Sequence, residues 1–139
     1  MIAKVALFSL DDHVYALSIE RIEQIVELPR LFPLPQIPGI FSGVLLFRQE
    51  VVPVVNLWNF FGTNDAKNST HASFAAVCSS GRGTVGLPAR QVLRIVDMAK
   101  GTLQLGDGGA EDAEQKYFLW AGKRYPLLTV DAILTRLPC

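Results

Sequence analysis

The 139-residue chain has few cysteines and no metal-binding pattern. Its two cysteines, Cys78 and Cys139, lie far apart and show no CxxC spacing. Together with the two histidines, His13 and His71, they form no ligand set for a metal ion. Two reduced thiols are therefore favoured over a metal site or a structural disulfide.

Charge of one sign and long apolar runs are also missing. The 13 basic and 13 acidic residues balance, and no lysine or arginine cluster occurs along the chain. This argues against a nucleic acid or an anionic membrane surface as the main partner. No apolar run approaches the ~20 residues that span a bilayer, and the N-terminal residues do not resemble a signal peptide. We expect a cytoplasmic protein without direct membrane insertion.

Half of the residues are hydrophobic, and their pattern is that of β-strands. Residues 43–57 form two apolar, β-branched-rich arms around the polar centre Arg48-Gln49-Glu50, which predicts a β-hairpin. Pro53 lacks a backbone N–H, so its strand is expected to bulge or to lie at a sheet edge. Residues 4–10 and 13–19 flank Asp11-Asp12 and predict a second hairpin.

The chain contains an internal repeat. Residues 16–27 match residues 86–97 in character at a constant offset of 70, and residues 50–57 match 123–130 at an offset of 73. Each half then supplies about five short strands, the number that closes a small barrel. The sequence predicts one all-β domain over residues 1–139 with two five-stranded β-barrels and a hydrophobic seam between them. The barrel-forming halves are approximately 1–61 and 73–139, and residues 62–72 form a polar linker.

Two segments differ between the halves. Residues 29–38 contain four prolines and are expected to be extended. In the second half a glycine- and acid-rich stretch, residues 101–114, takes their place and is expected to be a loop. Residues 130–134 fit either a short helix or a strand.

No catalytic constellation is evident. Cys78 lies in an apolar strand, which favours a core thiol over an activated thiolate. His13 and His71 lie in polar turn or linker segments, and Gly81–Gly86 lacks the Lys-Ser/Thr ending of a phosphate-binding loop. We expect no catalytic residues, no metal and no cofactor. Phe47 beside Arg48 has the composition of an interface hot spot instead.

The chain resembles the CheW-like domains of bacterial chemotaxis arrays. The residues that carry the resemblance are Val14-Tyr15-Ala16-Leu17, Ile22-Glu23-Gln24-Ile25, Gly43 to Arg48, Val52 to Leu57, Val85-Gly86-Leu87 with Val92, and Pro126 to Asp131. The resemblance implies the two-barrel fold. It also implies a non-catalytic adaptor that bridges the regulatory domain of a CheA-type histidine kinase and the cytoplasmic tip of a methyl-accepting chemoreceptor.

We expect two partner-binding regions on this basis. A groove between the barrels, with Arg48 at its rim, would take the apolar face of a receptor helix; its lining residues would be Ile22, Ile25, Val44, Leu46 and Val92. The hairpin from Phe47 to Pro53 would contact the kinase. The candidate partner-binding residues are Ile22, Gln24, Ile25, Val44, Leu46, Phe47, Arg48, Glu50, Pro53 and Val92.

The sequence also departs from the family pattern. Family members usually have glycine where Gln49 stands, and acidic residues at the positions of Gln24, Asn56, Arg90 and Thr129. Charge complementarity governs the choice of partner, so two alternatives stay open. One is a diverged module of a non-chemotaxis two-component pathway, and the other is a small-ligand-binding β-barrel protein with an aromatic pocket.

Overall fold

The computed structural model describes residues 3–10, 13–27, 41–57, 72–81, 83–105 and 116–134. The elements in chain order are β1 (Lys4–Leu10), β2 (His13–Ser18), η1 (Ile19–Arg21), β3 (Ile22–Glu27), β4 (Phe41–Phe47), β5 (Glu50–Val55), β6 (Phe74–Ser80), β7 (Gly83–Ala89), β8 (Gln91–Asp97), η3 (Met98–Lys100), β9 (Thr102–Leu105), β10 (Lys116–Trp120), β11 (Lys123–Leu127) and α2 (Val130–Leu134). The proline-rich segment and nearly all of the predicted linker lie outside the described residues. Within the described ranges, no helix is long and apolar enough to cross a membrane.

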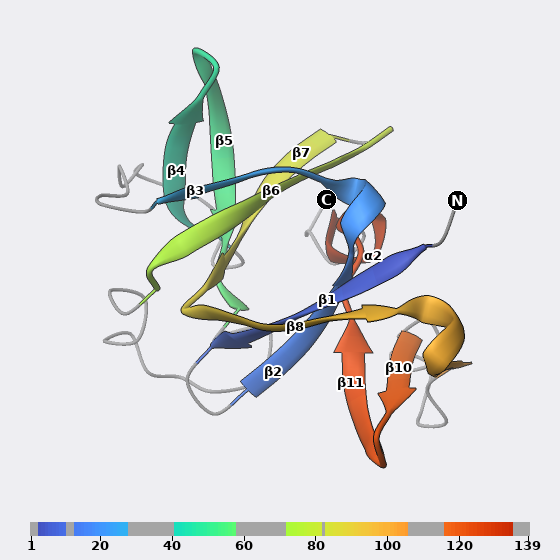
Figure 1. Ribbon diagram of the computed structural model, residues 1–139. Helices are drawn as coiled ribbons and strands as arrows, with labels where there is room; N and C mark the ends of the chain where they lie inside the picture. The colour runs from blue at the N-terminus through green and yellow to red at the C-terminus, as the bar shows by residue number, and fades with distance from the viewer. Residues whose placement is uncertain are drawn as a thin grey trace.

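The strands form two sheets. The six-stranded sheet has the order β8-β1-β2-β11-β10-β9, and the five-stranded sheet has the order β3-β6-β7-β5-β4. The hairpins β4–β5 and β10–β11 project at opposite ends of the molecule, as Figure 1 shows. The prediction of an all-β fold with two similar units is confirmed.

Each sheet takes strands from both halves of the chain, and this corrects the expectation that residues 1–61 and 73–139 each close one barrel. The first half contributes β1 and β2 to the six-stranded sheet but places β3, β4 and β5 in the five-stranded sheet, with β3 at its edge against β6. The second half does the reverse, because β6 and β7 belong to the five-stranded sheet, whereas β8, β9, β10 and β11 belong to the six-stranded sheet, with β8 paired to β1. Each sheet therefore joins the first two strands of one half to the later strands of the other half.

The strand registers follow the sequence repeat. β3 is bulged at Glu23, between the pairs Ile22↔Cys78 and Gln24↔Val77. β8 is bulged at Leu93, 70 residues later, between Val92↔Phe8 and Arg94↔Leu7. The two parallel pairings correspond as well, since Val54↔Gly86 and Leu127↔Ala16 are related by the offsets of 73 and 70. The repeat is therefore a property of the fold.

Three apolar clusters hold the sheets together. One lies within the six-stranded sheet, around Val5, Leu7 and Phe118, and one within the five-stranded sheet, around Phe47, Val54 and Val77. The third, here called the central core, joins the two sheets and contains Ala6, Phe8, Leu10, Tyr15, Leu17, Val55, Leu57, Ala76, Cys78, Val85, Leu87, Ala89, Leu128, Val130 and Ile133. This central core is the hydrophobic seam that the sequence predicted.

Two local expectations are wrong. Residues 102–105 of the predicted loop form β9, which adds a sixth strand beside β10. Pro53 lies in β5, an inner strand between β7 and β4, and no register shift occurs at the proline. The pairing of β5 with β7 consists of one parallel bridge, at the next residue, Val54. A missing N–H at Pro53 therefore interrupts little of the ladder.

Candidate partner-binding surfaces

The β4–β5 hairpin ends in an exposed aliphatic pair. Leu46 and Val51 are cross-strand neighbours and are 63% and 61% exposed. Directly opposed side chains on one face of a sheet are in contact range, so the two form one small apolar surface. We call this pair the tip patch. Leu46 was predicted as a partner-binding residue, whereas Val51 was not, although its position opposite Leu46 in the hairpin was the available signal.

The turn of this hairpin is built from Arg48 and Gln49. Both residues have positive φ, 53° and 68°, as the tight turn of a two-residue hairpin demands. The Arg48 guanidinium lies 4.8 Å from the centroid of the Phe47 ring, a cation–π distance that orients the cation beside the tip patch. Glu50, also exposed, pairs with Phe47 across the hairpin.

Phe47 itself is a core residue. Its side chain is 7% exposed and belongs to the cluster within the five-stranded sheet, with Leu45, Val52 and Val77. This corrects the expectation that Phe47 forms a hot spot whose removal spares the fold, because a buried phenylalanine typically contributes ~3–5 kcal/mol to stability. The alternation of the strand buries Phe47 and exposes its neighbour Leu46.

The predicted groove residues fall into two groups. Ile22 and Ile25 pair with Cys78 and Ala76, and Val92 pairs with Phe8. All three partners belong to the central core. These aliphatic side chains therefore lie on the sheet faces that carry the central core, but on the edge strands β3 and β8. Val44, by contrast, is buried on β4, at the other edge of the five-stranded sheet. Val44 and Leu46 lie on one face of β4, and the core residues Leu45 and Phe47 lie on the other.

One aliphatic residue of these edge strands, Ile95, was not predicted as a partner-binding residue. Ile95 pairs with Ala6 of the central core and is 56% exposed. Its counterpart in the repeat is Ile25, 70 residues earlier, and this relation was the signal that identifies it. We call Ile22, Ile25, Val92 and Ile95 the edge surface. Gln24 is exposed on β3 beside it and pairs with Val77 of the neighbouring cluster.

The environment of Cys78 does not favour a nucleophilic role. Cys78 is a free, buried thiol, and burial, followed by the charge of Glu23, raises the pKa of this thiol to about 12. A thiol in this state is protonated at neutral pH and is a poor nucleophile. Among the described residues, no group of three or more His, Cys, Asp or Glu side chains is placed to hold a metal ion.

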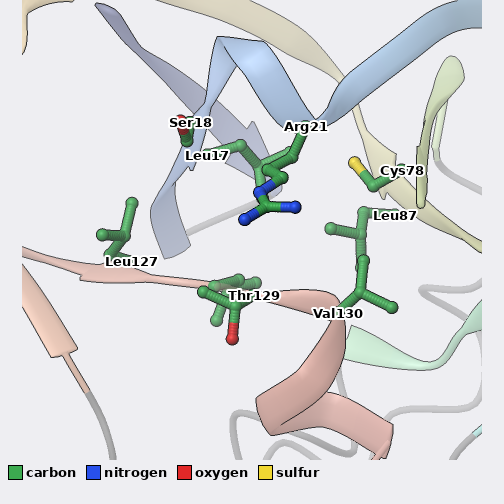
Figure 2. A pocket seen from close by; sticks show the side chains of 9 residues that line it. Leu17, Ser18, Arg21, Cys78, Leu87, Leu127, Thr129 and Val130 are labelled. Atoms are coloured by element: carbon green, nitrogen blue, oxygen red, sulfur yellow. The ribbon is translucent and has the colours of Figure 1, made fainter. Parts of the chain in front are cut away.

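A cavity lies between the sheets at the central core. Its volume is about 90 Å³, and its walls include Leu17, Cys78, Leu87 and Val130, with Arg21 beside them. Figure 2 shows the Arg21 guanidinium in the space between Leu17 and Leu87. The alternative reading of the sequence predicted an aromatic pocket, whereas no aromatic side chain lines this one.

The family model for the CheW-like domain matches residues 4–137. The chain belongs to the CheW-like domain family. The resemblance inferred from the sequence motifs is thereby confirmed. The two sheets described above, each built from strands of both halves, are the form that the CheW-like fold takes in this chain.

Among characterised relatives, two chemotaxis proteins CheW are similar over a 59-residue stretch. The protein of Treponema pallidum is 29% identical there and that of Thermotoga maritima 30%. Each stretch covers 42% of this CheW-like chain, but only 35% and 39% of the relatives' lengths. The crystal structure of the scaffolding protein TtCheW from Thermoanaerobacter tengcongensis superposes with a TM-score of 0.74 at 18% identity, over 94% of this chain and 90% of that one. This likeness shows the shared fold.

One departure from the CheW-like pattern has a clear structural role. Thr129, at a position where family members usually have an acid, accepts a hydrogen bond from the Ala132 backbone N–H to its Oγ1 at 3.1 Å. It therefore caps the first turn of α2, a task that threonine and aspartate both perform. The cap also resolves the ambiguity of residues 130–134 in favour of a helix.

Proposed function

We propose that the chain is a non-catalytic adaptor in chemotaxis-type signal transduction, which couples the cytoplasmic tip of a chemoreceptor to the regulatory domain of a CheA-type histidine kinase. Membership of the CheW-like family and the similarity to two chemotaxis proteins CheW support this proposal. Both partners lie in the cytoplasm, so we infer a cytoplasmic location for the chain as well.

The observation that carries the proposal is that exposed aliphatic side chains lie on separate parts of the molecule. We assign two of these groups to partners, and a third, Leu103 and Leu105 on β9, provides the control residues. The tip patch lies on the β4–β5 hairpin, and the edge surface lies on β3 and β8, which belong to different sheets. An adaptor that joins two proteins needs two such surfaces, because a single one would make the partners compete. Groups of exposed aliphatic side chains favour protein contacts over solvent.

We assign the kinase contact to the tip patch. Leu46 and Val51 offer a compact apolar centre, and Arg48, held against the Phe47 ring, offers a fixed charge at its rim. An apolar centre with a polar rim is the usual arrangement of a protein interface. The exposed Glu50 adds a charge of the opposite sign on the same hairpin, which helps to fix the orientation of the partner.

We assign the receptor contact to the edge surface. Ile22, Ile25, Val92 and Ile95 suit the apolar face of an amphipathic helix, whose anchors recur every three or four residues. The bulges at Glu23 and Leu93 support this assignment, because each brings two residues that are three apart in sequence, Ile22 with Ile25 and Val92 with Ile95, onto one face of the strand. Val44 and Gln24 then lie outside the main contact, and Gln24 would replace a usual ionic group by a neutral one.

The test is co-elution with a kinase regulatory domain from the same genome on a sizing column. We expect the unmodified chain to form a complex at tens of micromolar. Leu46→Ala should weaken the complex by about 1–3 kcal/mol, as removal of a central interface residue does, and Arg48→Glu should abolish it. Leu105→Ala is the matched control, because Leu105 is a leucine of similar exposure, 60%, on the distant edge strand β9.

Separate elution of the unmodified chain and the kinase domain would refute the coupling role and favour a diverged module of another pathway. Equal weakening by Leu46→Ala and Leu105→Ala would instead remove the tip patch from the interface. The receptor contact is tested in the same way with a receptor cytoplasmic fragment, Ile95→Glu and the control Leu103→Glu.

A further inference from the structure

The cavity at the central core breaks the internal symmetry of the fold. Leu17 and Leu87 both face the cavity and are equivalent residues of the two halves, related by the offset of 70. The repeat relates Cys78, a third lining residue, to Phe8. The ring of Phe8 is fully buried and lies 5.6 Å from the ring of Tyr15 and 5.9 Å from that of Phe74. The space that a phenyl ring fills on one side of the repeat is left open by a small thiol on the other.

The charge at the cavity is asymmetric too. Arg21 lies beside the cavity, whereas its counterpart in the repeat is the neutral Gln91. In the part of the chain that the structure describes, no ion pair or hydrogen bond engages Arg21. Glu23, two residues further on, accepts a hydrogen bond from Ser79 Oγ at 2.9 Å instead. The guanidinium is thus available to a ligand.

The walls of the cavity define what such a ligand must be. They are mostly aliphatic, and the thiol of Cys78 is neutral because burial raises its pKa to about 12. An anion held by Arg21 therefore meets no thiolate there. We propose that this cavity binds a short-chain aliphatic monocarboxylate, with the carboxylate on the Arg21 guanidinium and the alkyl chain among Leu17, Leu87 and Val130.

The chemistry and the size agree. A guanidinium presents paired donors that match the two oxygens of a carboxylate, and an apolar hollow with one such group is the common design of a small-molecule site. The volume of about 90 Å³ is smaller than the roughly 150 Å³ cavity that accepts benzene in another protein. A ligand of about three to five carbons follows from this comparison, and butyrate is the natural probe. The site does not depend on the proposed adaptor function.

The experiment is a titration of the full chain, labelled at its Leu and Val methyl groups, with sodium butyrate against sodium chloride of equal concentration. We expect saturable millimolar-range shifts of the methyl signals of Leu17, Leu87 and Val130. Butan-1-ol, which has the same chain length without the charge, should bind roughly tenfold more weakly or worse. A melting temperature that rises with butyrate concentration should accompany the shifts.

Arg21→Gln decides the role of the guanidinium. We expect it to weaken butyrate binding roughly tenfold or more, while Lys100→Gln leaves binding unchanged. Lys100 is a matched control, because each residue is the basic end of a three-residue 3-10 helix, η3 for Lys100 and η1 for Arg21. Cys78→Leu, which narrows the cavity, should abolish binding in a chain whose methyl spectrum stays dispersed.

Three results would overturn the proposal. The first is the absence of saturable shifts at the methyl groups of Leu17, Leu87 and Val130 when butyrate reaches tens of millimolar and at least a 50-fold molar excess over the protein. The second is equal binding of butyrate by the Arg21→Gln variant, which would leave the carboxylate without a partner. The third is equal binding of butan-1-ol, which would make the cavity a site for apolar solutes in general. Arg21 is exposed, so its replacement tests binding without threatening the fold.

Discussion

Arg48 and Gln49 carry a backbone conformation that side-chain-bearing residues seldom adopt. The equivalent turn between β10 and β11 is made by Ala121 and Gly122, with φ of 52° and 76°. A glycine adopts this region freely, whereas a residue with a Cβ is destabilised there by ~1–2 kcal/mol. The first turn thus has no glycine where the second has one. The sequence predicted this hairpin and the absence of glycine in its turn, but not that both turn residues would take positive φ.

Replacement of Gln49 by glycine should therefore stabilise the protein. We expect the free energy of unfolding to rise by about 0.5–1 kcal/mol, the relief of strain less the added entropy of the unfolded chain. Urea denaturation followed by tryptophan fluorescence measures the change. The reverse substitution in the other hairpin, Gly122→Gln, should lower stability by a similar amount. An unchanged or lower stability of Gln49→Gly would mean that the turn is not strained.

Side-chain burial at single positions was less predictable. The pairing of an aromatic with an arginine at Phe47-Arg48 suggested an interface anchor, yet the phenyl ring belongs to the core of the five-stranded sheet. Strand alternation assigns Leu46 and Phe47 to opposite faces but does not say which face is covered. That depends on Ala75 and Val77 of β6, a strand distant in sequence, which belong to the same cluster as Phe47.

The strands themselves were largely predictable, since alternation and turn chemistry are local properties. β9 is the exception. Its residues Thr102-Leu103-Gln104-Leu105 alternate polar and apolar side chains, but the glycines and acids around them favoured a loop. Gly101, directly before β9, is what lets this strand approach β10. A Cβ there would clash with the Phe118 ring and would lie 2.6 Å from the carbonyl oxygen of Leu119.

Gly101→Ala should accordingly push β9 away from β10. We expect a loss of about 1–3 kcal/mol in the free energy of unfolding, typical of forced overpacking, and faster amide exchange in Thr102–Leu105. Gly81→Ala provides the control, because no atom lies within 4 Å of a Cβ built at that glycine. Equal exchange rates in both variants would show that β9 does not need the close approach.

At the scale of the whole molecule, the sheets are tied together by a buried hydrogen bond as well as by the central core. Tyr15 on β2 donates its hydroxyl to the carbonyl oxygen of Pro88 on β7 at 2.7 Å. The ring is fully buried, and burial raises the pKa of this phenol well above its usual range, so the hydroxyl keeps its proton. A bond between distant strands of two sheets left no mark in the local sequence pattern.

Tyr15→Phe should weaken the junction between the sheets. The variant leaves the Pro88 carbonyl without this donor in a buried site, which typically costs about 1–3 kcal/mol in stability. Urea denaturation should show that loss in a single transition, because each sheet contains strands from both halves, which makes the two sheets unfold together. Tyr125→Phe, at a half-buried tyrosine of the six-stranded sheet, should change stability much less. Two separate transitions would contradict the expected cooperativity.

The repeat was visible in the sequence, and the distribution of strands between the sheets was not. An offset of 70 relates β3 to β8 whether each strand stays with its own half or crosses to the other. Partner choice between distant strands rests on packing and chain connectivity, which a period-two pattern does not encode. The similarity of the halves therefore predicted two alike units but not which strands each unit contains.

The distribution of strands also makes the two halves of the chain structurally dependent on each other. A chain cut once between Leu57 and Ala72 would consist of two interlocked pieces, because each sheet combines strands from both sides of the cut. Neither piece would contain a complete sheet. Made separately, the first piece would lack β6 and β7 from the middle of the five-stranded sheet, and the second would lack β1 and β2 from the middle of the six-stranded sheet.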